Sequence, residues 1–162
     1  MAPRRRLMRT VDKRRVNAPV AQVFQAAADV ERWPELLSHY RWVRFHEQRD
    51  SGGVVEMAAW RPFGRLRYPT WWMSEMWLDR SAPAVHYRHV AGITRGMEVV
   101  WRFVPAGRAT DVSIVHQWGG PEWPLIGRPV ANWIIGPVFI HAIASRTLAG
   151  IGRAVERAGE QQ

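Results

Sequence analysis

The sequence contains no cysteine, and this absence removes several kinds of chemistry from consideration. Disulfide bonds, thiolate zinc sites and cysteine nucleophiles are all excluded over its 162 residues. Any reaction that the chain catalyses must therefore use side chains such as tyrosine, histidine, serine or glutamate. A chain without cysteine also suits the cytoplasm, where we expect this protein to reside.

The sequence has no hydrophobic run long enough to span a membrane. Its longest uncharged stretch covers residues 129–145 and is interrupted by Asn132, Gly136 and His141. This stretch falls short of the roughly 20 apolar residues that a spanning helix needs. We therefore expect a buried or membrane-touching helix here. We expect no signal peptide, because no apolar segment follows the arginines near the N-terminus.

The positive charge is concentrated at one end of the chain. The formal net charge is +9, and residues 1–16 alone contribute +6. The rest of the chain is nearly balanced, whereas nucleic-acid-binding domains usually carry a basic patch of their own. We therefore expect no nucleic-acid partner. We divide the chain into a basic arm (1–7), a single domain (8–158) and a short tail (159–162), since its length suits one domain.

Two sequence periods indicate the fold class. Over most of residues 40–118 apolar and polar residues alternate, and turn residues recur without intervening helical segments, which predicts an antiparallel meander. The predicted strands are 8–16, 40–49, 54–61, 66–78, 84–90, 96–104 and 109–118. Helical spacing follows Pro19, a short helical turn begins at Trp33-Pro34, and a long helix begins at Pro137. The predicted class is α+β, with two short helices between the first two strands.

One strand leaves the orientation of a carboxylate open. Alternation in residues 54–61 is less regular than elsewhere, and it favours Glu56 and Trp60 on the inner face. A carboxylate among tryptophans would have a raised pKa and would suit proton transfer near neutral pH. A shift of one residue would instead turn Glu56 to solvent, and the sequence supports both orientations equally.

Two segments carry a resemblance to a known family. Residues 16–24 read VNAPVAQVF and residues 29–36 read DVERWPEL, with Tyr40 shortly after. Near the C-terminus, the Thr147-Leu148 pair and Glu156 fit the same pattern. Over residues 8–158 the sequence therefore resembles the START/SRPBCC superfamily, most closely its polyketide cyclase/dehydrase branch, the bacterial aromatase/cyclases.

The resemblance implies a helix-grip fold, in which a curved seven-stranded antiparallel sheet wraps around a long C-terminal helix and leaves a deep hydrophobic cavity. The cyclases of this family hold a poly-β-ketone chain there and guide aldol condensation and dehydration with tyrosine, serine and arginine side chains. Tyr40 and Ser74 match the tyrosine and the serine, whereas Met76 stands where the cyclases have an arginine. A thioether cannot polarise a ketone, so the electrophilic role would pass to His89 or His116.

The candidate site combines this resemblance with the alternation of the strands. The expected catalytic residues are Tyr40, Glu56, Ser74, His89 and His116. The expected ligand-binding residues are Trp60, Tyr68, Trp72, Met76, Tyr87, Trp101 and His141. The six histidines lack the spacing of metal-binding motifs, so we expect no metal and no other cofactor.

Two functions are compatible with these residues. The first is a polyketide cyclase/aromatase-like protein that promotes aldol cyclisation and dehydration of a hydrophobic ligand. The second is a non-catalytic carrier or sensor of a lipid, quinone or isoprenoid, which Met76 favours. Trp71, Trp77, Trp123 and Trp133 suit a peripheral membrane contact or a homodimer surface, and ordinary sheet packing explains them as well.

Overall fold

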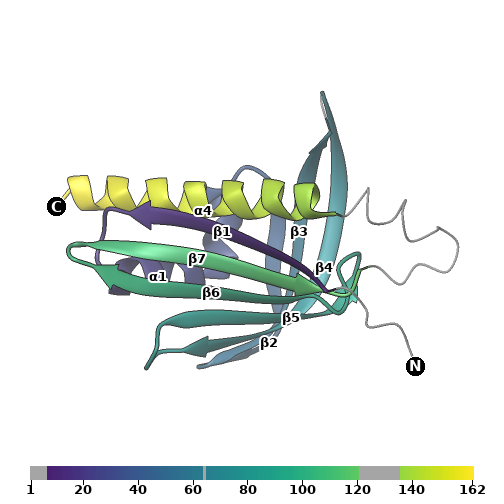
Figure 1. The fold of residues 1–162 in the computed structure, drawn as a ribbon, viewed down its shortest axis with the longest axis horizontal. Helices are drawn as coiled ribbons and strands as arrows, with labels where there is room; N and C mark the ends of the chain where they lie inside the picture. Colours follow the sequence, from purple (N-terminus) through teal and green to yellow (C-terminus); the bar gives the residue numbers. More distant parts are fainter. Residues whose placement is uncertain (1–6, 64, 121–135) are drawn as a thin grey trace, which may run out of the picture.

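Figure 1 shows the fold in a computed structural model, which describes residues 7–63, 65–120 and 136–162. The strands are β1 (Met8–Val16), β2 (Tyr40–Arg49), β3 (Gly52–Phe63), β4 (Leu66–Asp79), β5 (Ala84–Gly92), β6 (Glu98–Ala106) and β7 (Ala109–Trp118). The helices are α1 (Val20–Ala28), the 3-10 turn η1 (Val30–Arg32), α2 (Trp33–Leu36) and α4 (Pro137–Glu160). The predicted strand bounds agree with these to within two residues. The predicted surface residues Trp123 and Trp133 lie outside the described residues.

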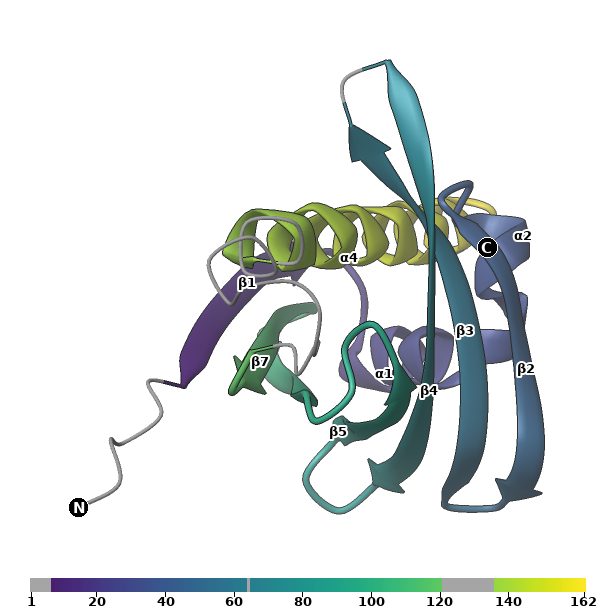
Figure 2. The ribbon, with the colours of Figure 1, turned by 90° about the vertical axis from the view of Figure 1, so that its right-hand side faces the viewer.

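The seven strands form one antiparallel sheet in the order β1-β7-β6-β5-β4-β3-β2. The sheet curves strongly, and α4 lies across its concave side, where it packs most closely on β1 (Figures 1 and 2). The shorter helix α1 contacts both α4 and the middle strands, so it also lies inside the curve. This is the helix-grip arrangement, and the predicted fold class is confirmed.

Prolines mark the starts of the helices, as the sequence predicts. Pro19 has an extended backbone and immediately precedes α1, Pro34 lies in the first turn of α2, and Pro137 is the first residue of α4. Proline suits these positions because its fixed φ angle fits the first helical turn, where an amide N–H would lack a partner. No described helix is long and apolar enough to cross a membrane.

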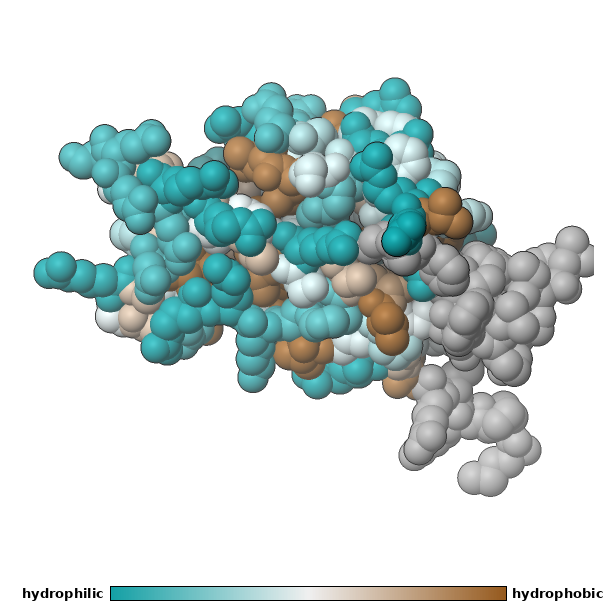
Figure 3. Space-filling model, turned by 90° about the horizontal axis from the view of Figure 1, so that it is seen from above, coloured by the Kyte–Doolittle hydropathy of each residue, from teal (hydrophilic) through white to brown (hydrophobic). Residues whose placement is uncertain are grey.

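Helix α4 turns one face toward the sheet. Its buried residues are Phe139, Ile140, Ala144, Thr147, Leu148, Gly150, Ile151, Gly152 and Val155. The predicted inward stripe is right for Ala144, Leu148 and Ile151, but it is wrong for His141, which is exposed. Seen from above, the face of the molecule over α4 is largely hydrophilic, with small separate apolar areas (Figure 3).

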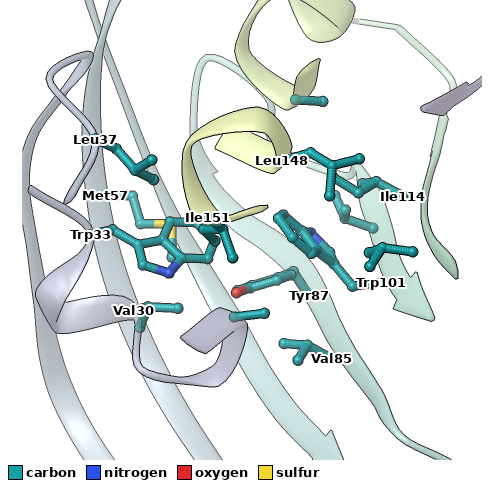
Figure 4. Packing of buried hydrophobic residues seen from close by; sticks show 14 of the residues in the cluster. Val30, Trp33, Leu37, Met57, Val85, Tyr87, Trp101, Ile114, Leu148 and Ile151 are labelled. Atoms are coloured by element: carbon teal, nitrogen blue, oxygen red, sulfur yellow. The ribbon is translucent and has the colours of Figure 1, made fainter. Parts of the chain in front are cut away.

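The core fills the space between α4 and the sheet with large side chains. Figure 4 shows Trp33 of α2, Tyr87 and Trp101 of the sheet, and Ile151 of α4 in one cluster. The rings of Trp33 and Trp101 lie 5.7 Å apart between centroids. Aromatic rings bury large apolar areas, so a tryptophan from each side of the cluster fixes the distance between the helices and the sheet.

The register of β3 corrects one predicted face. Val55 and Met57 are fully buried in the core, and Met57 pairs with the inward-facing Trp72 of β4. Because successive side chains of a strand point to opposite faces, Glu56 and Trp60 lie on the outer face of β3. The alternative of a one-residue shift is therefore the correct one. Alternation could not decide it, since β3 contains apolar residues of both parities.

Candidate functional site

An internal cavity of about 60 Å³ lies between the sheet and α4. Side chains from α2, from α4 and from every strand except β1 line it. The lining residues are Trp33, Tyr40, Met57, Trp72, Tyr87, His89, Val99, Trp101, Ile114, His116, Ile143, Ala144 and Thr147. Six residues predicted for the site are among them, namely Tyr40, Trp72, Tyr87, His89, Trp101 and His116.

Two buried histidines give the cavity neutral polar groups. Burial lowers the pKa of His89 to about 3 and that of His116 to about 4, because an apolar environment disfavours the charged imidazolium. Both rings are therefore neutral at pH 7. His89 Nδ1 bonds the Thr94 hydroxyl at 2.5 Å, and its ring stacks on Trp72 with centroids 5.9 Å apart.

Tyr40 belongs to a small hydroxyl cluster at the α4 side of the cavity. Its hydroxyl lies 3.5 Å from Thr147 Oγ1, which donates to the Ile143 carbonyl at 2.8 Å. His39 Nε2 contacts the same Thr147 oxygen at 2.9 Å. Burial raises the pKa of Tyr40 well above its ordinary value, so the phenol stays protonated and offers a hydrogen-bond donor.

Three buried polar atoms near the cavity have no hydrogen-bond partner among the described residues. They are the Ser74 hydroxyl, the Tyr87 hydroxyl and His116 Nδ1. Ser74 pairs with His89 across β4 and β5, so it lies beside the lining although it is not part of it. Each unpaired buried polar group costs free energy. An oxygen-bearing ligand could satisfy these groups.

Comparison with known proteins decides the family. Residues 16–138 match the family described as polyketide cyclase/dehydrase and lipid transport. The chain belongs to this family. The sequence matches no curated protein.

Solved structures of other cyclase-like proteins share the fold. The aromatase/cyclase ZhuI from Streptomyces sp. R1128 superposes with a TM-score of 0.79 at 17% identity, over 93% of this chain and 94% of its own. TTHA0849 from Thermus thermophilus gives 0.79 at 18% identity, over 93% and 99%. The di-domain aromatase/cyclase StfQ of the steffimycin biosynthetic pathway gives 0.70 at 15% identity, over 98% of this chain and 52% of its own. At these identities the likeness shows the helix-grip fold.

Glu56 does not line the cavity of this cyclase-family chain. Its carboxylate accepts hydrogen bonds from Arg44 at 2.8 Å and from Trp71 Nε1 at 2.6 Å, and it contacts His46 Nε2 at 2.8 Å. The bond from Arg44 is the main cause that lowers the pKa of Glu56 to about 2. The predicted raised pKa is therefore wrong, because Glu56 faces basic partners outside the sheet and lies away from the tryptophans within it.

Four further predicted ligand-binding residues also lie away from the cavity. Trp60 is half-buried on the outer face of the sheet, and Tyr68 is 60% exposed near the end of the β3–β4 hairpin. Met76 is buried but faces another hollow, next to α1. His141 bonds Asp12 of β1, with its own side chain 66% exposed. These positions depend on strand register and helix rotation.

The sequence analysis missed several residues of the lining. They are Trp33, Met57, Val99, Ile114, Ile143, Ala144 and Thr147. Most are apolar, and nothing in the sequence separates a cavity-lining apolar residue from an ordinary core residue. Thr147 carried a usable signal, because a hydroxyl on the apolar stripe of α4 must find a partner inside the fold.

The described residues contain no group of three or more histidine and acidic side chains arranged to hold a metal ion. The closest approach to such a group is Glu56 with His46, where Arg44 occupies the carboxylate as well. The polar atoms of the cavity are instead hydroxyls and neutral imidazoles. Such groups bind an uncharged ligand by hydrogen bonds.

Proposed function

We propose that this protein binds a neutral aromatic molecule that carries ketone or hydroxyl oxygens, and that it acts on such a molecule as a polyketide cyclase. The observation that carries the proposal is the pairing of an aromatic lining with unpartnered buried polar atoms, the Tyr87 hydroxyl and His116 Nδ1. Membership of the polyketide cyclase/dehydrase family supports it.

The reaction would be an aldol condensation followed by dehydration. A carbon beside one ketone loses a proton and attacks a second carbonyl carbon, the new alkoxide takes up a proton, and water then leaves. The Tyr87 phenol, which burial keeps protonated by raising its pKa, would donate to the attacked carbonyl oxygen. His116 would accept the proton from carbon and return it to oxygen, because a developing enolate beside the ring raises the imidazole pKa.

The size of the cavity constrains how such a ligand enters. Its volume of about 60 Å³ is far below the roughly 300–1,000 Å³ of typical ligand pockets. A polycyclic ligand would therefore need α4 and its side chains Ile143 and Thr147 to move away from the sheet. Binding coupled to such a movement is slower than docking into a preformed pocket.

A non-catalytic carrier is the second candidate, and one observation favours it. Among the described lining residues there is no charged side chain, since both histidines are neutral and the expected arginine is replaced by Met76. A neutral aromatic cavity is sufficient to hold a quinone or an isoprenoid. Rate measurements separate the two candidates.

Binding is tested with 1,8-dihydroxyanthraquinone as the probe and calorimetry or tryptophan quenching as the readout. Tyr87→Phe removes one hydroxyl and His116→Gln removes one ring, so we expect each to weaken binding about tenfold. The matched control is His86→Gln, since His86 stacks on Trp77 outside the cavity with centroids 5.0 Å apart. Equal affinities in all four proteins would refute the proposed site.

Turnover is tested with heptane-2,4,6-trione, which loses one water on ring closure to give 5-methylresorcinol. We expect the wild-type protein to accelerate formation of this product over buffer, and Tyr87→Phe to slow it more than it weakens anthraquinone binding. Anthraquinone binding without any acceleration would instead establish the carrier. Chromatography of the product decides between the two outcomes.

A further inference from the structure

The β3–β4 hairpin projects from the domain beyond α4 (Figures 1 and 2). Close to its end, Leu66 is 72% exposed and Tyr68 is 60% exposed, and the two flanking arginines, Arg65 and Arg67, are exposed as well. We call these four residues the hairpin surface. Large apolar side chains at such exposure, away from the core, mark a contact with a partner.

The charge around the hairpin surface has one sign. The sequence from residue 57 to residue 74 contains three arginines and no acidic residue. Behind the hairpin surface, the guanidinium groups of Arg41 and Arg67 lie over the Trp60 ring, 4.6 and 5.3 Å from its centroid. The nearest carboxylate along β3, Glu56, is already engaged by Arg44 and His46.

We propose that the hairpin surface docks on a lipid bilayer that contains anionic phospholipids. Leu66 and Tyr68 would enter the interface between headgroups and acyl chains, where tyrosine and tryptophan rings are favoured. Arg65 and Arg67 would contact the lipid phosphates, and Arg41 would add to the same field from the base of the hairpin.

The hairpin surface fits a bilayer better than the alternatives. A nucleic acid would use arginines and stacking aromatic rings, but an aliphatic side chain as exposed as Leu66 has no partner on a phosphate backbone. An acidic protein would need a matching pocket for Leu66, whereas acyl chains accept it without shape complementarity. The hairpin base is tied to the domain where the Arg61 guanidinium lies 5.4 Å from the centroid of the Phe139 ring of α4, so a docked hairpin would hold the rest of the domain at the membrane.

Vesicle co-sedimentation tests the charge component with the full chain. We expect binding to phosphatidylglycerol-containing vesicles at low salt, and much weaker binding to pure phosphatidylcholine. Arg65→Glu with Arg67→Glu should weaken binding at least 25-fold, since each basic residue near an anionic surface strengthens binding roughly fivefold. The matched control reverses two exposed arginines of β6 and the β6–β7 turn, Arg102→Glu with Arg108→Glu, which lowers the net charge equally.

A single labelled cysteine tests insertion, because the native chain has none. Leu66→Cys carrying an environment-sensitive nitrobenzoxadiazole dye should shift to the blue and brighten on phosphatidylglycerol vesicles. The control is Val104→Cys, since Val104 is 57% exposed at the opposite hairpin. This experiment needs no cavity ligand, so its failure is separate from that of the proposed function.

Three results would overturn the proposal. One is the absence of wild-type binding to anionic vesicles, and another is an equal loss in the two charge-reversed variants. The third is binding of a 20-base-pair DNA duplex that depends on Arg65 and Arg67 while vesicle binding does not. A blue shift confined to the residue 66 label, together with a selective loss in the hairpin variant, would support the proposal.

Discussion

At the scale of single residues, Asp12 is the buried charge with the least support. It is 4% exposed, its Oδ1 contacts His141 Nδ1, and its Oδ2 has no partner among the described residues. Burial raises the pKa of Asp12, and the bond to His141 opposes that rise. The imidazole therefore does more than close a surface contact, because it is what keeps a carboxylate tolerable under α4.

We expect His141→Ala to lower the free energy of unfolding at pH 7 by about 1–2 kcal/mol. This value lies toward the lower end of the range for a lost buried partner, because His141 itself is largely exposed and water can enter. The deficit should shrink as the pH falls toward 4. A protonated Asp12 costs less to bury, and the raised pKa means that the folded state then binds the proton more readily than the unfolded chain.

Urea unfolding of both proteins between pH 4 and pH 7.5 measures this dependence. The double variant Asp12→Ala with His141→Ala is the control, since it removes the buried carboxyl and should lose the pH dependence of the deficit. A deficit for His141→Ala that stays constant with pH would mean that lost packing of the ring, and not the charge of Asp12, sets the cost.

At the scale of elements, the approach of α4 to the segment after α2 depends on a glycine. A Cβ atom at Gly150 would lie 2.1 Å from Leu37 Cδ2, well inside van der Waals contact. Leu37 is 2% exposed, so it has little free space to move into. The close packing of these two elements therefore requires a residue without a side chain on this face of the helix.

We expect Gly150→Ala to destabilise the fold by about 1–2 kcal/mol. Overpacking costs roughly 1–3 kcal/mol and outweighs the gain of up to about 1 kcal/mol that alanine brings to a helix interior. Gly159→Ala is the matched control in the same helix, because a Cβ there meets nothing within 4 Å. It should leave stability unchanged or raise it slightly, as measured by thermal unfolding. Equal effects at both positions would contradict a steric cause.

The predicted elements and their predicted faces fared differently, and the reason is physical. Turn residues and helix-starting prolines act locally, so the bounds of the strands and the start of α4 at Pro137 follow from neighbouring residues. The face of β3 does not, since Val54 and Val55, and again Ala58 and Ala59, make both faces apolar. Pairing with β4, which places Met57 opposite Trp72, is what turns Glu56 outward.

At the scale of the whole molecule, buried neutral histidines make the fold sensitive to acid. Burial lowers the pKa of His39 to about 4, as it does for His116, and that of His89 to about 3. Below the ordinary histidine pKa of 6.5 the unfolded chain takes up protons at these sites and the folded protein does not. Stability is therefore highest above about pH 6.5 and falls as the pH drops toward 4.

We expect each of these histidines to contribute a slope of up to about 1.4 kcal/mol per pH unit between pH 6.5 and its folded pKa. His116→Gln should reduce the total slope by close to one proton, measured as the change in urea midpoint between pH 5 and pH 6.5. His86→Gln, at the outer surface, should leave the slope unchanged. A slope that is identical in the wild type and in His116→Gln would show that the His116 ring is charged in the folded protein.

The sequence by itself determined the α+β class, the seven strands, the positions of the helix starts and the family, because each depends on local spacing or on short motifs. It also placed Tyr40, Tyr87, His89 and His116 among the candidates for the cavity. Only the tertiary structure decided which polar groups share an environment. It brought Thr147 into the cavity and His141 onto Asp12, and it turned Glu56 toward Arg44. Strand pairing and helix rotation set these contacts, and both are fixed by packing between segments far apart in the chain.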